Sequence, residues 1–154
     1  MKRRCWNCLD KDAKMKLSSF FSVTVLSLLV AAAGGASDGT IRDAKNAIIG
    51  KIENNGTVRN GQNATIGKFY SDGTIRNASN AAVGKIQNDG TIRNRQNAAI
   101  GRVHSDGTVR NGQNAMLGKV ENDGTVRNAG NANIGTAKGV KKEWAAVFFF
   151  FDLF

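Results

Sequence analysis

The chain contains no proline, two cysteines and a single histidine, and aromatic residues make up only 7% of it. Without proline, the 18 glycines do not indicate a collagen-like chain. One histidine argues against a histidine-based catalytic site. Both cysteines, Cys5 and Cys8, lie near the N-terminus. They can therefore neither form a disulfide framework for the rest of the chain nor complete a zinc site, which needs four ligands.

The segment that begins at Met15 has the three parts of a secretory signal peptide. Lys16 gives a basic start, an apolar run extends from Phe20 to Ala33, and small residues follow. The run is shorter than the roughly 20 residues that cross a bilayer as a helix, and an uncleaved anchor or a buried helix is the alternative. We expect export to the periplasm, the cell surface or the extracellular space, with cleavage after Ala33 or Ala36. Residues 1–14 either extend the basic region or precede a translation start at Met15.

Removing residues 1–36 as the N-terminal extension and signal peptide changes the charge of the protein. The whole chain carries 22 Lys and Arg against 12 Asp and Glu, a net charge of +10. Residues 37–154 keep sixteen basic and ten acidic residues, a net charge of +6, and no cysteine. An exported domain of this kind is held together by packing and hydrogen bonds, and its excess of positive charge favours an anionic partner.

Residues 38–139 consist of six consecutive units of 17 residues, such as DGTIRNASNAAVGKIQN at 72–88. Counted from the first Asp or Asn of each unit, six positions never change. These are glycine at the second position, threonine at the third, arginine at the fifth, asparagine at the ninth, alanine at the tenth and glycine at the thirteenth. The fourth, twelfth and fifteenth positions are apolar. One unit cannot bury its apolar side chains alone, so the pattern predicts neighbouring units that share a core.

Each unit predicts two short strands and two turns, and hence an all-β domain over 37–139. The Asp-Gly or Asn-Gly pair marks one tight turn, and the asparagines at the sixth and ninth positions bracket another. The fifteenth position has the opposite parity to the twelfth, and the intervening glycine is where a bulge or bend could return it to the same face. We expect a β-solenoid of six repeats, with an antiparallel meander of six hairpins as the alternative. The solenoid would stack hydrogen-bonded rows of like side chains, for example Asn63, Asn80, Asn97 and Asn114.

The C-terminal segment 140–154 combines a basic break with the apolar run WAAVFFFFDLF. It is too short to span a bilayer as a helix and suits one strand. We expect a cap strand that closes the end of the core, because repeat proteins need atypical ends. Contact with a membrane is the alternative. The candidate cap or membrane residues are Trp144, Phe148, Phe149, Phe150, Phe151 and Phe154.

The phrase I-G-K-I-x-N-D-G-T-I-R-N, followed by an aromatic C-terminal run, resembles the short glycine-punctuated β-repeats of a group of exported bacterial proteins. The resemblance covers residues 38–154. It implies an exported β-repeat protein and assigns neither an activity nor functional residues.

The invariant arginine is the best candidate for a binding function. A threonine lies two residues before each arginine, so both are expected to point outward from one strand face. A neighbouring turn aspartate could pair with the arginine as a purely structural ladder. The functional alternative is a cationic strip for a repeating anionic ligand. The strip would comprise Arg42, Arg59, Arg76, Arg93, Arg110, Arg127, Thr57, Thr74, Thr91 and Thr108.

The repeat contains no recurring combination of Ser, His and Asp and no separate pair of carboxylates, so we expect no enzymatic activity, cofactor or metal site. The fourteenth position adds a second basic row, which comprises Lys51, Lys68, Lys85, Arg102 and Lys119. Aromatic residues are not interleaved with these two basic rows, and export argues against nucleic acid as a partner. We expect a structural or adhesive protein of the bacterial cell envelope that binds an anionic polysaccharide or another envelope protein. A membrane-associated or membrane-inserted protein that uses its Phe-rich C-terminus is the alternative.

Overall fold

A computed structural model describes residues 39–154 of the chain. The predicted signal peptide, its cleavage positions at Ala33 and Ala36, and the two cysteines lie outside the described residues. Within residues 39–154, no helix combines the length and the apolar character needed to cross a membrane.

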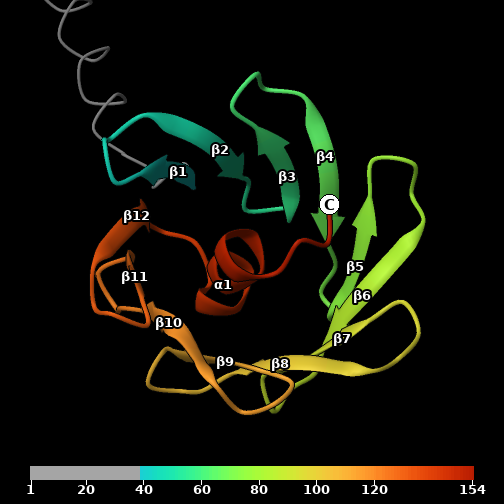
Figure 1. The fold of residues 1–154 in the computed structure, drawn as a ribbon. Helices are drawn as coiled ribbons and strands as arrows, with labels where there is room; N and C mark the ends of the chain where they lie inside the picture. Colours follow the sequence, from blue (N-terminus) through green and yellow to red (C-terminus); the bar gives the residue numbers. More distant parts are fainter. Residues whose placement is uncertain (1–38) are drawn as a thin grey trace, which may run out of the picture. The chain divides into compact units, whose positions relative to one another are not determined.

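Each repeat unit forms one β-hairpin, and six hairpins follow one another along the chain. The strands are β1 (Thr40–Asp43), β2 (Ile48–Ile52), β3 (Thr57–Asn60), β4 (Thr65–Phe69), β5 (Thr74–Asn77), β6 (Ala82–Ile86), β7 (Thr91–Asn94), β8 (Ala99–Val103), β9 (Thr108–Asn111), β10 (Met116–Val120), β11 (Thr125–Asn128) and β12 (Asn133–Ala137). Every strand pairs antiparallel with its neighbours in the chain, and β1 also pairs with β12. The twelve strands therefore close into a barrel (Figure 1).

The predicted solenoid is wrong, and the antiparallel hairpin arrangement held as its alternative is confirmed. The reason lies in the turns, because both turns of a unit reverse the chain tightly. At the Asp-Gly turn, the Gly90 N–H donates to the Gln87 carbonyl (2.9 Å), and the Gln87 N–H donates to the Thr91 carbonyl (2.8 Å). Gly90 has φ +83°, so the turn closes with a residue in the left-handed region, as three-residue hairpin loops do.

The second turn has the same form but uses asparagine in place of glycine. Asn97 has φ +65° and donates its N–H to the Asn94 carbonyl at 2.9 Å. The Asn94 side-chain oxygen accepts hydrogen bonds from the N–H groups of Gln96 and Ala98, both at 3.0 Å. The asparagines that were expected to stack as ladders therefore sit one per turn, where their tolerance of positive φ is needed.

A bulge in the second strand of each unit turns the fifteenth position inward, as the parity argument allowed. In the first unit, Ile41 lies opposite Gly50 and Arg42 lies opposite Ile48, which leaves Ile49 as the extra residue. The bulge thus falls on the aliphatic residue just before the glycine that was expected to carry it. The fourth and fifteenth positions are buried in every unit and form the lining of the barrel.

The C-terminal segment forms a helix inside the ring of strands rather than the predicted cap strand. Helix α1 (Lys142–Phe150) lies in the middle of the barrel (Figure 1), and Ala145, Ala146 and Val147 are fully buried. A strand is excluded there for a physical reason. A closed barrel has no free edge for a thirteenth strand, so a segment in its interior must satisfy its own backbone hydrogen bonds, as a helix does.

Candidate functional site

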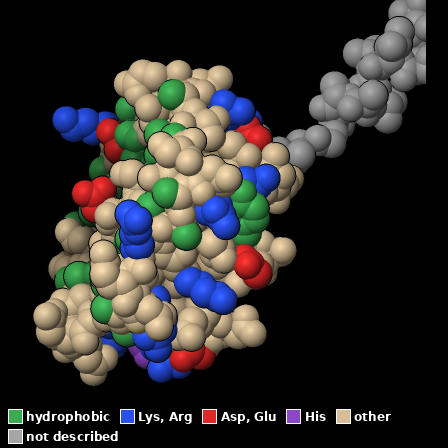
Figure 2. Space-filling view, turned by 90° about the vertical axis from the view of Figure 1, so that its right-hand side faces the viewer, with side chains coloured by type: hydrophobic (Ala, Val, Ile, Leu, Met, Phe, Trp, Pro, Cys, Tyr) green, Lys and Arg blue, Asp and Glu red, His purple; other side chains and the backbone are tan. Residues whose placement is uncertain are grey.

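The register of the barrel places the basic residues of neighbouring strands directly opposite one another on the outer wall. The base at the fourteenth position of one unit faces the arginine at the fifth position of the next, for example Lys68 opposite Arg76. Thr136 interrupts the series opposite Arg42, where the barrel closes. We call the series the basic belt: Arg42, Lys51, Arg59, Lys68, Arg76, Lys85, Arg93, Arg102, Arg110, Lys119 and Arg127. Figure 2 shows Lys and Arg side chains spread over one face of the wall.

The predicted straight strip of arginines is thus a ring around a barrel. All six arginines of the strip make the same local contact, in which a guanidinium nitrogen donates to the backbone carbonyl of the asparagine four residues later. These distances lie between 2.7 Å, for Arg76 and Arg93, and 3.1 Å, for Arg59 and Arg127. Each arginine therefore anchors the left-handed asparagine turn of its own hairpin, which explains why it does not vary among units.

The predicted pairing of these arginines with the turn aspartates is not what the described residues show. Asp72 binds Thr74 instead, accepting from its backbone N–H and from its hydroxyl, both at 2.9 Å. The same two bonds recur at Asp89, Asp106 and Asp123. In all four carboxyls, the hydrogen bond from the threonine backbone is the largest of the causes that lower the pKa. The threonines of the strip thus hold the Asp-Gly turns.

The sixteenth position, which varies from unit to unit, decides which belt arginines are neutralised. Glu53 accepts a hydrogen bond from Arg59 Nε at 2.8 Å, and Glu121 does the same with Arg127 at 2.8 Å. The bond from Arg59 holds the pKa of Glu53 below its ordinary value. Sequence reasoning missed these pairs because the partners are six residues apart and face each other only once the hairpin register is known.

A fourteenth-position base of the belt also forms an ion pair. Arg102 lies 3.6 Å from Asp89, and both side chains are about half exposed (50% and 53%). Exposed pairs of this kind contribute little to stability. Among residues 39–154, no group of three or more His, Cys, Asp or Glu side chains is placed to hold a metal ion.

The C-terminal candidates lie against the inside of the barrel. Six tail side chains each approach the thirteenth-position glycine of a different unit. The pairs are Phe148 with Gly50, Phe149 with Gly135, Phe150 with Gly118, Phe151 with Gly101, Leu153 with Gly84 and Phe154 with Gly67. A Cβ atom added at five of these six glycines would come within 3 Å of the ring that rests on it, and at Gly84 it would lie 3.3 Å from Leu153. We call these six glycines the glycine sockets.

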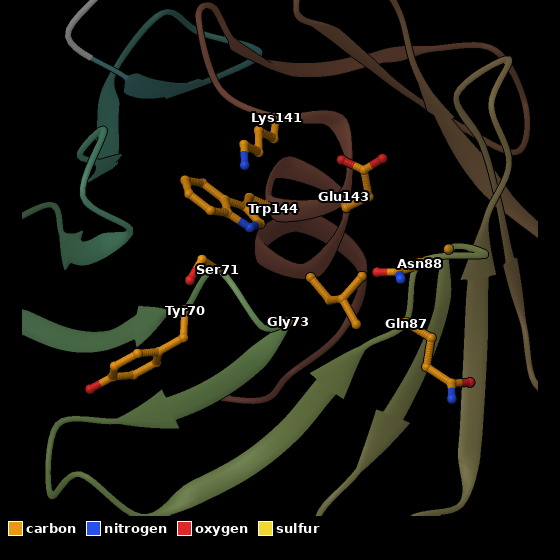
Figure 3. Close-up of a pocket in the computed structure, with 10 residues that line it drawn as sticks. Tyr70, Ser71, Gly73, Gln87, Asn88, Lys141, Glu143 and Trp144 are labelled. Atoms are coloured by element: carbon orange, nitrogen blue, oxygen red, sulfur yellow. The ribbon is translucent and has the colours of Figure 1, made fainter.

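Trp144 lies where the helix begins, at the end of the barrel that carries the Asp-Gly turns. Its ring stacks on Phe69, with centroids 5.1 Å apart and an interplanar angle of 6°, and Lys141 Nζ lies 4.7 Å from the Trp144 ring centroid. Beside it is a hollow of about 190 Å³ between two turns. In Figure 3 the Asn88 side chain points toward this hollow, while the Tyr70 ring points away from it.

Comparison with known proteins places the described fold in one family. A family model described as 5-fold beta-flower protein matches residues 38–152, which is most of the chain. This chain has six repeat units in that range. No curated protein and no solved structure matches the chain.

Proposed function

The chain belongs to the 5-fold beta-flower protein family, and from this premise we propose that it is an exported structural or adhesive barrel of the bacterial cell envelope whose basic belt binds anionic polysaccharide. The observation that carries the proposal is the cross-strand pairing of cations around the wall, such as Lys85 opposite Arg93. Like charges directly opposite each other destabilise a sheet. An anionic polymer lying across the strands relieves that repulsion and releases its own counterions.

The contacts of the belt decide which variants test the proposal. The arginines anchor the asparagine turns, so replacing them would alter stability and binding together. The lysines at the fourteenth position are better targets. We expect Lys68→Ala combined with Lys85→Ala to elute from immobilised heparin at a clearly lower salt concentration than the native protein, because binding through exposed charges is screened by salt.

The matched control removes two positive charges outside the belt. Lys45 and Arg95 lie in exposed asparagine turns, so Lys45→Ala combined with Arg95→Ala changes the net charge by the same amount. Equal loss of retention in both double variants would mean that net charge alone holds the protein on the column. A native protein that passes through at low salt would refute the proposal.

Membrane association through the Phe-rich C-terminus is the second candidate function. The observation in its favour is a hollow of about 330 Å³ lined by Ile66 and the segment 148–154, where several tail rings are only partly buried. For the tail to enter lipid, however, its side chains would have to leave the glycine sockets.

Deleting residues 144–154 distinguishes the two roles of the tail. If the tail is only the core of the barrel, the shortened protein loses stability and aggregates. A membrane element predicts instead a folded protein that no longer floats with lipid vesicles. Thermal unfolding and vesicle flotation of the native and shortened proteins measure both properties.

A further inference from the structure

We infer that the basic belt contains one preferred subsite, formed by Lys68, Tyr70 and Arg76, for a single acidic sugar residue of a polysaccharide. This inference rests on the proposed function of the belt and locates its strongest contact. The repeat makes the comparison possible, because the same three positions occur in other units with different side chains.

The first observation is that the second unit has no carboxylate at its sixteenth position, which is the position that faces Arg76. Arg59 and Arg127 each bind a glutamate six residues earlier in the chain, at 2.8 Å. The residue six positions before Arg76 is Tyr70. The Arg76 guanidinium carbon lies 5.7 Å from the centre of the Tyr70 ring. Arg76 keeps its hydrogen bond to the Asn80 carbonyl at 2.7 Å, so the guanidinium is held in place without being neutralised.

The second observation concerns the base that faces Arg76 across the strands. Three fourteenth-position bases, Lys85, Arg102 and Lys119, are near the aspartate at the first position of their own unit, and each contributes to the lowered pKa of that carboxyl. In the unit of Lys68 this first residue is Asn55, which has no charge. Lys68 Nζ instead lies 5.4 Å from the centre of the same Tyr70 ring.

The result is one aromatic ring next to two cations that face each other in the sheet. Tyr70 is one of the three large hydrophobic side chains that are exposed among the described residues, at 37%. Its ring is directed away from the Trp144 hollow (Figure 3), so it is on the outer side of the turn. Asp72, in the same turn, is bound to Thr74 through both carboxylate oxygens.

These three groups match the chemistry of an acidic sugar. Lys68 and Arg76 provide two positive charges for a carboxylate or sulfate group, and the tyrosine provides an apolar surface with a hydroxyl for the sugar ring. A uronate and a sulfated sugar share this chemistry. Oligomers of galacturonate and heparin oligosaccharides serve as the two probes, and dextran serves as the neutral control.

The decisive experiment compares Tyr70→Glu with Gln87→Glu by titration calorimetry at low salt. Both variants place a glutamate at the sixteenth position next to a belt arginine, and both change the net charge equally. Gln87 already bonds to Arg93 Nε at 3.0 Å, so each new glutamate has a guanidinium partner. We expect Tyr70→Glu to weaken binding about tenfold, and Gln87→Glu to weaken it no more than about threefold.

Three further variants keep the test independent of folding. Asn55→Asp restores the carboxylate that other units carry beside the base, and we expect it to weaken binding although the turn is unchanged. Tyr70→Phe is expected to retain binding, and Tyr70→Gln is expected to lose about threefold with no change of charge. Thermal unfolding of each variant checks that the barrel is intact.

The outcomes separate the subsite from the belt. Equal losses for Tyr70→Glu and Gln87→Glu would overturn the subsite and leave the belt as a uniform polyanion surface. Binding of either acidic probe by the native protein, with the expected order of variants, supports both. If the native protein binds neither probe at low salt, both proposals are wrong.

Discussion

Replacing Phe151 with alanine should show how much the tail contributes to the barrel. Phe151 is only 8% exposed, and its ring rests on the Gly101 socket, where an added Cβ would lie 2.5 Å from Phe151 Cε1. Removing a buried phenylalanine side chain costs about 3–5 kcal/mol, because it leaves a cavity. Since domains of this size are stable by roughly 5–15 kcal/mol, the loss is a large fraction of the total.

The corresponding measurement is urea and thermal unfolding followed by circular dichroism. At about 4 °C per kcal/mol, the melting temperature should fall by roughly 12–20 °C. Leu153→Ala is the matched control, because Leu153 is partly exposed and would lie 3.3 Å from a Cβ at Gly84. It should be less destabilising than Phe151→Ala.

A double-mutant cycle tests the contact itself. Gly101→Ala alone overfills the socket and should destabilise the protein by about 1–3 kcal/mol. In the Phe151→Ala background the clash with the ring is gone, although the added Cβ still meets the Arg110 carbonyl oxygen at 2.5 Å. The second substitution should therefore be less destabilising than in the native protein, by at least about 0.5 kcal/mol. Additive effects would refute a direct contact between ring and glycine.

The turns provide three further predictions, all measured by thermal unfolding. Asn97→Ala should destabilise by about 1 kcal/mol because alanine tolerates φ +65° poorly, whereas Asn97→Gly should be close to neutral. Arg93→Ala should also destabilise, since it removes the 2.7 Å bond to the Asn97 carbonyl, and Arg95→Ala in the exposed turn should not. The four threonine-bonded aspartates have lowered pKa values, so their stabilisation is present above their ordinary pKa near 4 and is lost as the pH falls through the lowered values. The melting temperature should thus be nearly constant from pH 7 to 5 and fall below about pH 4. The fall should be less steep in Asp89→Asn, because an asparagine at this position can accept the same backbone bond without titrating, as Asn55 does at 2.9 Å.

Local structure could be predicted from the repeat because each turn is determined by a few neighbouring residues. The Asp-Gly turn, the asparagine turn and the two strands of each unit all follow from side chains within one unit. The inward direction of the fifteenth position also followed from parity, once a bulge was allowed. The topology did not follow, because the same short strands suit parallel stacking and hairpins equally well. The pairing that closes the barrel, Ile41 opposite Ala137, joins the two ends of the repeat region. No pattern among neighbouring residues of the sequence indicates this pairing.

The candidate site was predicted in composition but not in arrangement. The invariant arginine was recognised, but its contact with the Asn97 carbonyl and its neighbours at the sixteenth position depend on the register of the hairpins. Two subsite residues were absent from the predicted strip: Lys68 belongs to the bases at the fourteenth position, which recur in five units, and Tyr70 occurs in one unit only. A signal for them was present in the sequence: the second unit has Asn55 where the other units begin with aspartate.

The tail explains why the thirteenth position is glycine in every unit. A ring of six similar units presents six similar sockets, but a single helical tail cannot have the same symmetry. Phe148 contacts the first unit, and the next three residues contact the sixth, fifth and fourth units in turn. Asp152 contacts no socket, and Leu153 and Phe154 contact the third and second units. Each unit thus receives a different tail side chain in a different orientation. Only a residue without a Cβ leaves room for every one of these side chains. The repeat therefore has glycine at all six positions, and the differences between the six contacts come from the tail.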